Sequence, residues 1–343
     1  MFFWLKDQLD FNDSAQFDAI ENLGEAGFAG RHLTLGDKAV IDSIASVAGF
    51  SRKASAYYKS VSSKYTQIGG VKRSLTKVNV SPLCQSPIWS NEWTVPLRSF
   101  RTDDSVEKVL LLVEHMYDYN VIKGLAEISL RELGLAGWVK LAVTPVSGGG
   151  GGTSLTLSVH QRNKSSLGIC VVDSDRPHIR GALGSTAKGC ERVYEERWGW
   201  TLHVLFAREL ENLVPPELFE MCGVDFQGGA GNSYDEERWA IHGFIDTKKG
   251  DCLCRFEALP AADISYAETR AALAHFPWRT SAACPSSLCS LGEGNEGALI
   301  SLSKALERHP LAAQRRLPSR VPPLTNLLRE VVGHAAAPRW SMI

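Results

Sequence analysis

The chain has 343 residues, of which 44% are hydrophobic and 22% are charged. This is the composition of an ordinary globular protein, and it excludes a disordered or fibrous chain. Lys and Arg together number 37, against 38 for Asp and Glu. The chain as a whole therefore lacks the excess positive charge of a polybasic nucleic-acid binder, and any contact with nucleic acid must come from a local patch.

The cysteines and the first residues bear on the cellular compartment. Residues 1–5 are apolar, but charged residues follow at once, which leaves no hydrophobic region of a secretory leader. No apolar run is long enough to cross a bilayer. Eight cysteines in such a chain predict reduced thiols, so we expect a cytoplasmic protein with no membrane partner.

One group of four cysteines is a candidate zinc site. Its members are Cys252, Cys254, Cys284 and Cys289. Their spacing does not match the usual Cys-x-x-Cys knuckle, so plain buried or surface thiols are the favoured interpretation.

Residues 1–104 form an N-terminal region of unknown role, with several short amphipathic stretches and no motif of evident chemistry. Basic and tyrosine side chains alternate between residues 52 and 77. Such a mixture can follow a phosphate backbone and stack bases, although a solvated helix face explains it more simply. The residues concerned are Arg52, Lys53, Lys59, Lys64, Lys72, Arg73 and Lys77, with Tyr57, Tyr58 and Tyr65.

From residue 105 to about 255 the pattern changes to α/β alternation. Apolar runs predict strands at 109–113, 139–143, 168–172 and 202–206, helices at 118–133 and 188–198, and an element of uncertain type at 155–159. Continuous apolar runs are typical of strands that helices cover on both faces. Strands separated by helices predict a parallel sheet with right-handed crossovers. Residues 256–343 are expected to be a mainly helical extension, with a helix at 298–308 before a basic stretch.

Acidic residues follow two of these strands. Glu114 comes directly after the first strand, and Asp118 lies one turn into the next helix, from where it can face back toward Glu114. Asp173 and Asp175 follow the third strand and, on extended chain, would point to the same side. Functional groups gather at the carboxyl edge of a parallel sheet, so we expect these four acids to lie together.

Four neighbouring carboxylates repel one another unless a cation neutralises them, and Mg²⁺ prefers such oxygen ligands. Two ions about 4 Å apart can clamp the attacking and leaving oxygens of a phosphodiester. Each acid has a simpler explanation when it is taken alone, since Glu114 could cap the following helix. The order of all four acids and the strands along the chain is a more specific sign of a metal site than any one acid.

Residues 112–118 (Leu-Val-Glu-His-Met-Tyr-Asp) and 171–175 (Val-Val-Asp-Ser-Asp) resemble, in order and spacing, the two acidic motifs of Toprim domains. The second acid, Asp118, is similar to the pattern of the overcoming-lysogenization-defect (OLD-like) nucleases. The resemblance implies a central Toprim-like parallel sheet flanked by helices over residues 105–255, with extra N-terminal and C-terminal α+β regions. It also implies that Glu114, Asp118, Asp173 and Asp175 bind Mg²⁺ or Mn²⁺. His115 stands where the family usually has glycine.

The same resemblance extends to residues 207–215, which look like the Glu-Asn segment of nuclease-type Toprim proteins. By that comparison Glu211 is a fifth metal ligand, although Glu209 competes for the role and a helix-start carboxylate is the simpler explanation. The family also carries a downstream lysine that stabilises transition-state charge. Lys248 is the candidate ahead of Lys249, and a polar hairpin turn explains this segment nearly as well.

These features lead us to expect a metal-dependent nuclease that hydrolyses phosphodiester bonds, with DNA a more probable substrate than RNA. The resemblance implies a role in anti-phage defence or repair. The chain has no Walker motif, and its glycines 148–152 lack the following Gly-Lys-Ser/Thr. We therefore expect a separate ATPase partner, and a homo-oligomer is left open. The alternatives are a primase- or topoisomerase-like Toprim enzyme and a non-catalytic nucleic-acid-binding or scaffolding protein.

Overall fold

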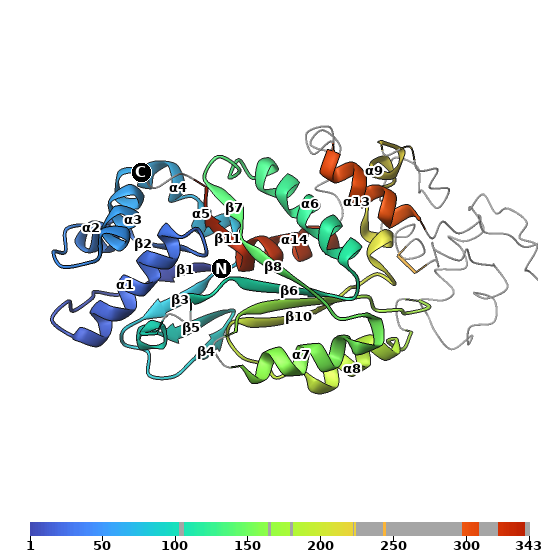
Figure 1. The fold of residues 1–343 in the computed structure, drawn as a ribbon, viewed down its shortest axis with the longest axis horizontal. Coiled ribbons are helices and arrows are strands. Elements are labelled where there is room, and N and C mark those ends of the chain that lie inside the picture. Colours follow the sequence, from blue (N-terminus) through green and yellow to red (C-terminus); the bar gives the residue numbers. More distant parts are fainter. Residues whose placement is uncertain are drawn as a thin grey trace, which may run out of the picture.

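The computed structural model describes two larger β-sheets, one mostly and one wholly parallel, with helices on their faces, lying side by side (Figure 1). The described residues are 1–102, 106–163, 166–178, 181–221, 223, 243–244, 297–308 and 322–339. Lys248, the four grouped cysteines and the basic stretch after residue 310 lie outside these ranges, so the predictions made for them stay predictions.

The N-terminal region, residues 1–102, is an α/β unit of a sheet with its helices, called a layer below; an α+β region was expected. Its strands run in the order β2-β1-β3-β5-β4, and all pairs are parallel except β4 with β5. The strands are β1 (Phe2–Leu5), β2 (Leu33–Gly36), β3 (Val78–Ser81), β4 (Ile88–Ser90) and β5 (Glu92–Pro96). The helices are α1 (Ser14–Phe28), α2 (Lys38–Ala45), α3 (Arg52–Ser63), α4 (Tyr65–Ile68), α5 (Val71–Ser74) and the 3₁₀ helix η1 (Leu97–Phe100).

The tyrosines of α3 belong to the core of this layer. Tyr57 and Tyr58 are fully buried. The Tyr57 hydroxyl donates to the carbonyl of Thr34, and that of Tyr58 donates to the carbonyl of Ile20, each at 2.8 Å. These two rings are therefore not available to stack bases. The exposed face of α3 carries basic side chains such as Lys53 and Lys59, as a solvated helix face predicts.

The second sheet confirms the predicted parallel α/β arrangement. Its order is β10-β9-β6-β8 and all its strands are parallel. The strands are β6 (Val109–Val113), β8 (Val143–Ser147), β9 (Gly168–Val172) and β10 (Trp200–Val204). The helices are α6 (Met116–Glu132), α7 (Thr153–Arg162) and α8 (Ser185–Val193). Figure 1 shows α6 on one face of this sheet and α7 with α8 on the other.

Period-two alternation along β9 divides the two faces. Cys170 and Val172 pack in the apolar cluster beneath α7 and α8, together with Leu112 and Trp200. Ile169 and the other alternate residues belong to the larger cluster on the α6 face. Both faces of β9 are thus covered, which is why this strand is an unbroken apolar run.

The strand predicted at 139–143 was wrong in its extent. Residues 139–141 form β7 (Val139–Leu141), which pairs antiparallel with β11 (Ala336–Pro338) in a separate sheet. The neighbour of β6 is instead β8, which contains Pro145. Proline lacks a backbone donor and is tolerated in an edge strand, and β8 lies at the edge of its sheet. Four other elements also differ in their bounds: the uncertain element at 155–159 is part of α7, and α6, α8 and β10 each begin and end earlier than predicted.

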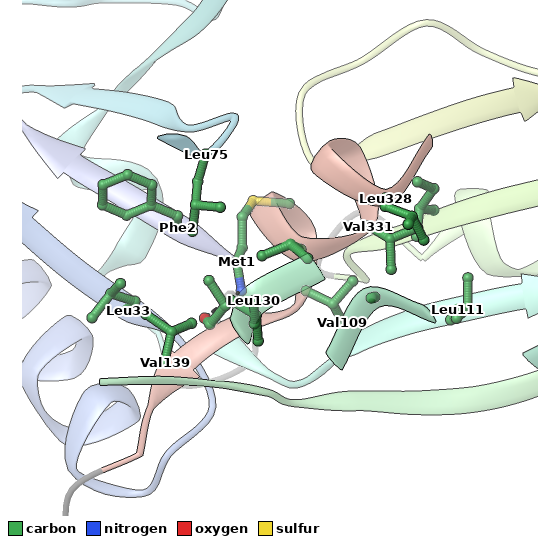
Figure 2. Close-up of a cluster of buried hydrophobic side chains, with 14 of the residues drawn as sticks. Met1, Phe2, Leu33, Leu75, Val109, Leu111, Leu130, Val139, Leu328 and Val331 are labelled. Atoms are coloured by element: carbon green, nitrogen blue, oxygen red, sulfur yellow. Dashed lines mark hydrogen bonds between the residues drawn. The ribbon is translucent and has the colours of Figure 1, made fainter. Parts of the chain in front are cut away.

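The C-terminal elements join the two layers. Helix α13 (Ala298–Arg308) has the predicted bounds and packs on α6, while α14 (Pro322–Ala335) contacts β1, β7, β9 and α6. One continuous apolar cluster includes side chains from both sheets. In Figure 2, Phe2 and Leu33 of the N-terminal sheet lie near Met1, and Val109 and Leu111 of the second sheet lie near Val331 of α14. No helix within the described residues is long and apolar enough to cross a membrane.

Candidate functional site

The order of the second sheet creates a switch point between β6 and β9. From β6 the chain passes through α6 to β8 on one side, whereas from β9 it passes through α8 to β10 on the other. Crossovers that leave in opposite directions open a crevice at the carboxyl ends of the two strands, which is where ligands bind in open α/β sheets. Glu114 follows β6 and Asp173 follows β9, so both acids lie at this crevice.

Glu114 is held at the crevice by hydrogen bonds. The residue is only 9% exposed, and its Oε1 accepts a hydrogen bond from the backbone N–H of Asp173 at 3.0 Å. Its carbonyl oxygen accepts from the N–H of Gly149, also at 3.0 Å. Gly149 and Gly150 have φ angles of 68° and 62°, a conformation that favours glycine. The glycine run is therefore a turn that closes the end of β8 against Glu114.

The surroundings of Glu114 raise the pKa of its carboxyl group. Burial is the main cause, the hydrogen bond from the Asp173 N–H opposes it, and the negative charges of Asp175 and Asp118 add to it. Asp175 and Asp118 therefore interact with Glu114 through their charges, and Asp173 does so through its backbone N–H. The Oδ2 of Asp118 accepts from the His115 N–H at 2.9 Å and caps the first turn of α6, so this side chain turns back toward the start of the helix.

Asp173 connects the crevice to the segment after β10. Its Oδ1 accepts from the N–H of Leu210 at 3.0 Å, which begins the 3₁₀ helix η4 (Leu210–Leu213). Glu209 and Glu211 are both buried, at 7% and 2% exposure. The structure thus brings residues 209–213 to Asp173.

The prediction that Asp173 and Asp175 share an extended chain was wrong. Asp175 has a φ of 51°, a left-handed conformation that aspartate tolerates better than most residues. Its N–H donates to the carbonyl of Arg208 at 2.9 Å, and the N–H of Gly184 donates to that of Ser174 at 2.8 Å. The chain therefore turns sharply after β9, and hydrogen bonds hold Asp175 in place.

Sequence analysis missed Gly184, which supports Asp175. A Cβ atom at Gly184 would lie 2.4 Å from both Cβ and Oδ2 of Asp175, closer than any ordinary contact. A second missed residue is Ser174, which is fully buried and donates from its hydroxyl to the carbonyl of Ala207 at 2.6 Å. The only sequence signal for Gly184 is its place just before the Ser that begins α8.

The donor set consists of carboxylates, which suit a hard cation such as Mg²⁺ or Mn²⁺. Among the described residues, no three Asp, Glu, His or Cys side chains converge closely enough to surround one ion. Mg²⁺ usually takes one or two protein carboxylates and keeps several waters, so the chemistry of the donors fits this ion without a closed cage.

The class of protein follows from the fold and this crevice: an α/β protein with one mostly parallel and one wholly parallel sheet, and with acids at the carboxyl edge of the second. Comparisons with protein-family models, with curated proteins and with solved structures gave no match. The resemblance of residues 112–118 and 171–175 to Toprim motifs therefore stays a prediction.

Proposed function

We propose that this protein is a metal-dependent nuclease that hydrolyses phosphodiester bonds of DNA. One observation carries the proposal: the hydrogen bond from the Asp173 N–H to the buried Glu114 carboxylate, which joins the two acidic motifs at the switch point of the sheet. Asp118 and Asp175 act on the same carboxyl group through their charges. Acids gathered at this crevice are suited to holding a cation against a phosphate.

Each acid has a role in this proposal. Glu114 binds the cation from a partly desolvated position, where electrostatic attraction is stronger than in water. Asp118, held by the first turn of α6, Asp173, held by Leu210, and Asp175 would provide further oxygens, directly or to the waters that the ion keeps. A bound Mg²⁺ or Mn²⁺ would polarise the phosphate and lower the pKa of a water nucleophile. Glu211 is proposed as a further ligand and Lys248 as the group that stabilises charge on the phosphate.

Hydrolysis is preferred over the alternative functions. Strand joining or synthesis in primases and topoisomerases would use a catalytic tyrosine domain or a zinc ribbon, and the sequence has neither signature. A non-catalytic scaffold would have no use for a carboxylate whose burial disfavours its charge. Because the sequence lacks a Walker motif, we propose that a separate ATPase licenses cleavage in anti-phage defence or repair, and that the protein acts with this partner or as a homo-oligomer.

The proposal is tested by cleavage of plasmid DNA and of labelled single- and double-stranded DNA and RNA, with Mg²⁺, with Mn²⁺ and with EDTA. Asp173→Asn keeps an oxygen acceptor for the Leu210 N–H but removes the charge. We expect it to lower metal-dependent cleavage by about a hundredfold or more. Glu191→Gln, which removes an exposed charge from α8, is the matched control and should cleave like the wild type.

Three outcomes separate the possibilities. Metal-dependent cleavage that Asp173→Asn abolishes supports the nuclease. Metal binding in calorimetry without cleavage by the purified protein directs the search to the ATPase partner. The absence of both metal binding and cleavage would overturn the proposal and favour a scaffold.

A further inference from the structure

Exposed aromatic side chains flank the acidic crevice. Among the described residues, three aromatic side chains are exposed: Trp89 at 56%, Tyr117 at 44% and Phe206 at 43%. Trp89 lies in the hairpin of β4 and β5, far along the chain from the acids. Tyr117 lies in the first turn of α6, three residues after Glu114, and Phe206 follows the end of β10. Two of the three exposed rings thus lie on segments that leave the carboxyl edge of the second sheet, Tyr117 at the start of α6 and Phe206 in the loop after β10.

The strand order places the end of β9, which leads to Asp173, between the two strand ends that lead to these rings. β9 lies between β6 and β10, so Asp173 leaves the sheet between the strand that leads to Tyr117 and the strand that leads to Phe206. Neighbouring strands are about 4.8 Å apart, so β6 and β10 are separated by about 10 Å. Bases stacked at about 3.4 Å each would cover that span with roughly three nucleotides.

Exposed rings at such a place suit nucleobases. Base stacking on aromatic side chains is sequence-tolerant, because every base offers a flat face. In a duplex those faces are covered by neighbouring base pairs, and a base reaches a protein ring only when it is unpaired or turned out of the helix. The loop after β10 also carries Arg208, and the loop after β9 carries Arg176; the positive charge of these side chains suits the backbone of a single strand.

We propose that the crevice takes single-stranded DNA, and that Tyr117 and Phe206 stack bases on either side of the phosphate at the acids. This inference rests on the proposed nuclease function for its choice of ligand. Tyr117 and Phe206 are binding residues that select the strand, while the acids act on the phosphate. Met116, exposed beside Tyr117 at 43%, extends the apolar surface on the β6 side.

The test measures binding of a labelled single-stranded oligonucleotide, and of the same sequence as a duplex, by fluorescence anisotropy in EDTA. Tyr117→Ala and Phe206→Ala should each weaken single-strand binding on the order of tenfold. Tyr117→Phe keeps the ring and should bind like the wild type. Trp89→Ala removes an exposed ring away from the crevice and serves as the control. Thermal unfolding of all variants should match that of Trp89→Ala, because the removed side chains are exposed.

Cleavage rates provide a second measurement. Stacking acts equally on ground state and transition state, so loss of a ring should raise KM for single-stranded DNA and leave kcat nearly unchanged. If wild-type protein cleaves DNA and both alanine variants bind and cleave as Trp89→Ala does, the inference is overturned while the nuclease stands. If the oligonucleotide binds through the rings but the protein neither binds a divalent metal in calorimetry nor cleaves DNA with any metal, the nuclease is overturned and the stacking site stands. Tighter binding of the duplex than of the single strand also overturns the inference.

Discussion

At the scale of single residues, Glu114 combines burial with negative charge. Burial removes water from its carboxylate, and the nearby charges of Asp175 and Asp118 oppose its ionisation, so the pKa of Glu114 is raised. The single N–H from Asp173 only partly compensates. A bound cation would remove this conflict, because it favours the ionised form.

We predict that Glu114→Gln is at least as stable as the wild type without metal. A carboxyl group whose folded pKa exceeds its unfolded pKa contributes stability at low pH and loses it as pH rises through the folded pKa. The neutral amide avoids this loss and still offers an oxygen to the Asp173 N–H. Urea unfolding at pH 7 in EDTA should therefore give Glu114→Gln a free energy of unfolding equal to or above that of the wild type.

The same variant should lose its response to metal. A ligand at about 100 times its Kd stabilises the folded state by about 2.7 kcal/mol, so saturating Mg²⁺ should raise the stability of the wild type and of Glu191→Gln but not that of Glu114→Gln. Equal stabilisation of all three proteins would show that the cation binds elsewhere.

Gly184 provides a test of the site that leaves every acid in place. We predict that Gly184→Ala weakens Mg²⁺ binding at least tenfold, because the new Cβ displaces the Asp175 side chain that lies 2.4 Å from its position. Calorimetric titration with Mg²⁺ measures the change. Gly137→Ala is the control, since a Cβ there meets nothing within 4 Å. Unchanged metal affinity in Gly184→Ala would remove Asp175 from the proposed ligands.

At the scale of elements, two glycines let α1 pack closely on α3. A Cβ at Gly27 would lie 2.4 Å from the ring of Tyr57, and one at Gly24 would lie 2.6 Å from that of Tyr58. Both rings are buried and hydrogen-bonded to backbone carbonyls, so neither is free to move aside. Glycine lowers the stability of helix α1 by about 1 kcal/mol relative to alanine, but it allows close contact between α1 and α3.

We predict that Gly27→Ala lowers the free energy of unfolding by about 1–3 kcal/mol, because overpacking outweighs the gain in helix propensity. Gly70→Ala is its matched control. Gly70 has helical backbone angles and open space around its Cα, so this substitution should be neutral or stabilising by up to about 1 kcal/mol. Urea unfolding of both variants measures the difference, and a Gly27→Ala variant as stable as Gly70→Ala would contradict the packing argument.

At the scale of the whole molecule, the two layers share one apolar core, and buried histidines lie within it. His32 of the N-terminal layer is fully buried. Its Nε2 lies 2.9 Å from the carbonyl of Val106, and its Nδ1 lies 2.8 Å from the amino group of Met1. Because a carbonyl only accepts, Nε2 carries the hydrogen and Nδ1 accepts from the amine. The ring is therefore neutral, and burial lowers the pKa of His32 well below its ordinary value.

Burial also lowers the pKa of His334 on α14. Because of these two lowered pKa values, we predict that the folded protein is less stable at acidic pH. The unfolded chain takes up these protons below about pH 6.5, while the folded protein does not. The free energy of unfolding should thus have its highest value above that pH. At lower pH it should decrease, by up to about 1.4 kcal/mol per pH unit for each histidine. Urea unfolding at pH 7.5 and 5.5 measures this, and His32→Gln should reduce the slope. A stability that does not change between these pH values would contradict the prediction.

The sequence by itself determined those helices and strands whose own residues show an apolar pattern that reveals which faces are buried. The runs at 109–113 and 168–172 are apolar throughout because helices cover both faces of those strands, and their ends located Glu114 and Asp173 at one edge. The amphipathic period of residues 298–308 located α13 in the same way.

Only the tertiary structure decided the features that depend on distant partners. The strand β7 pairs with β11, nearly 200 residues away along the chain, and the short strands of the N-terminal layer acquire their order only through such pairing. The left-handed turn at Asp175, its contact with Gly184 and the bond from the Leu210 N–H to Asp173 arise from loops that meet in space. The apolar pattern of a sequence records which faces are buried, but it does not record which other segment buries them.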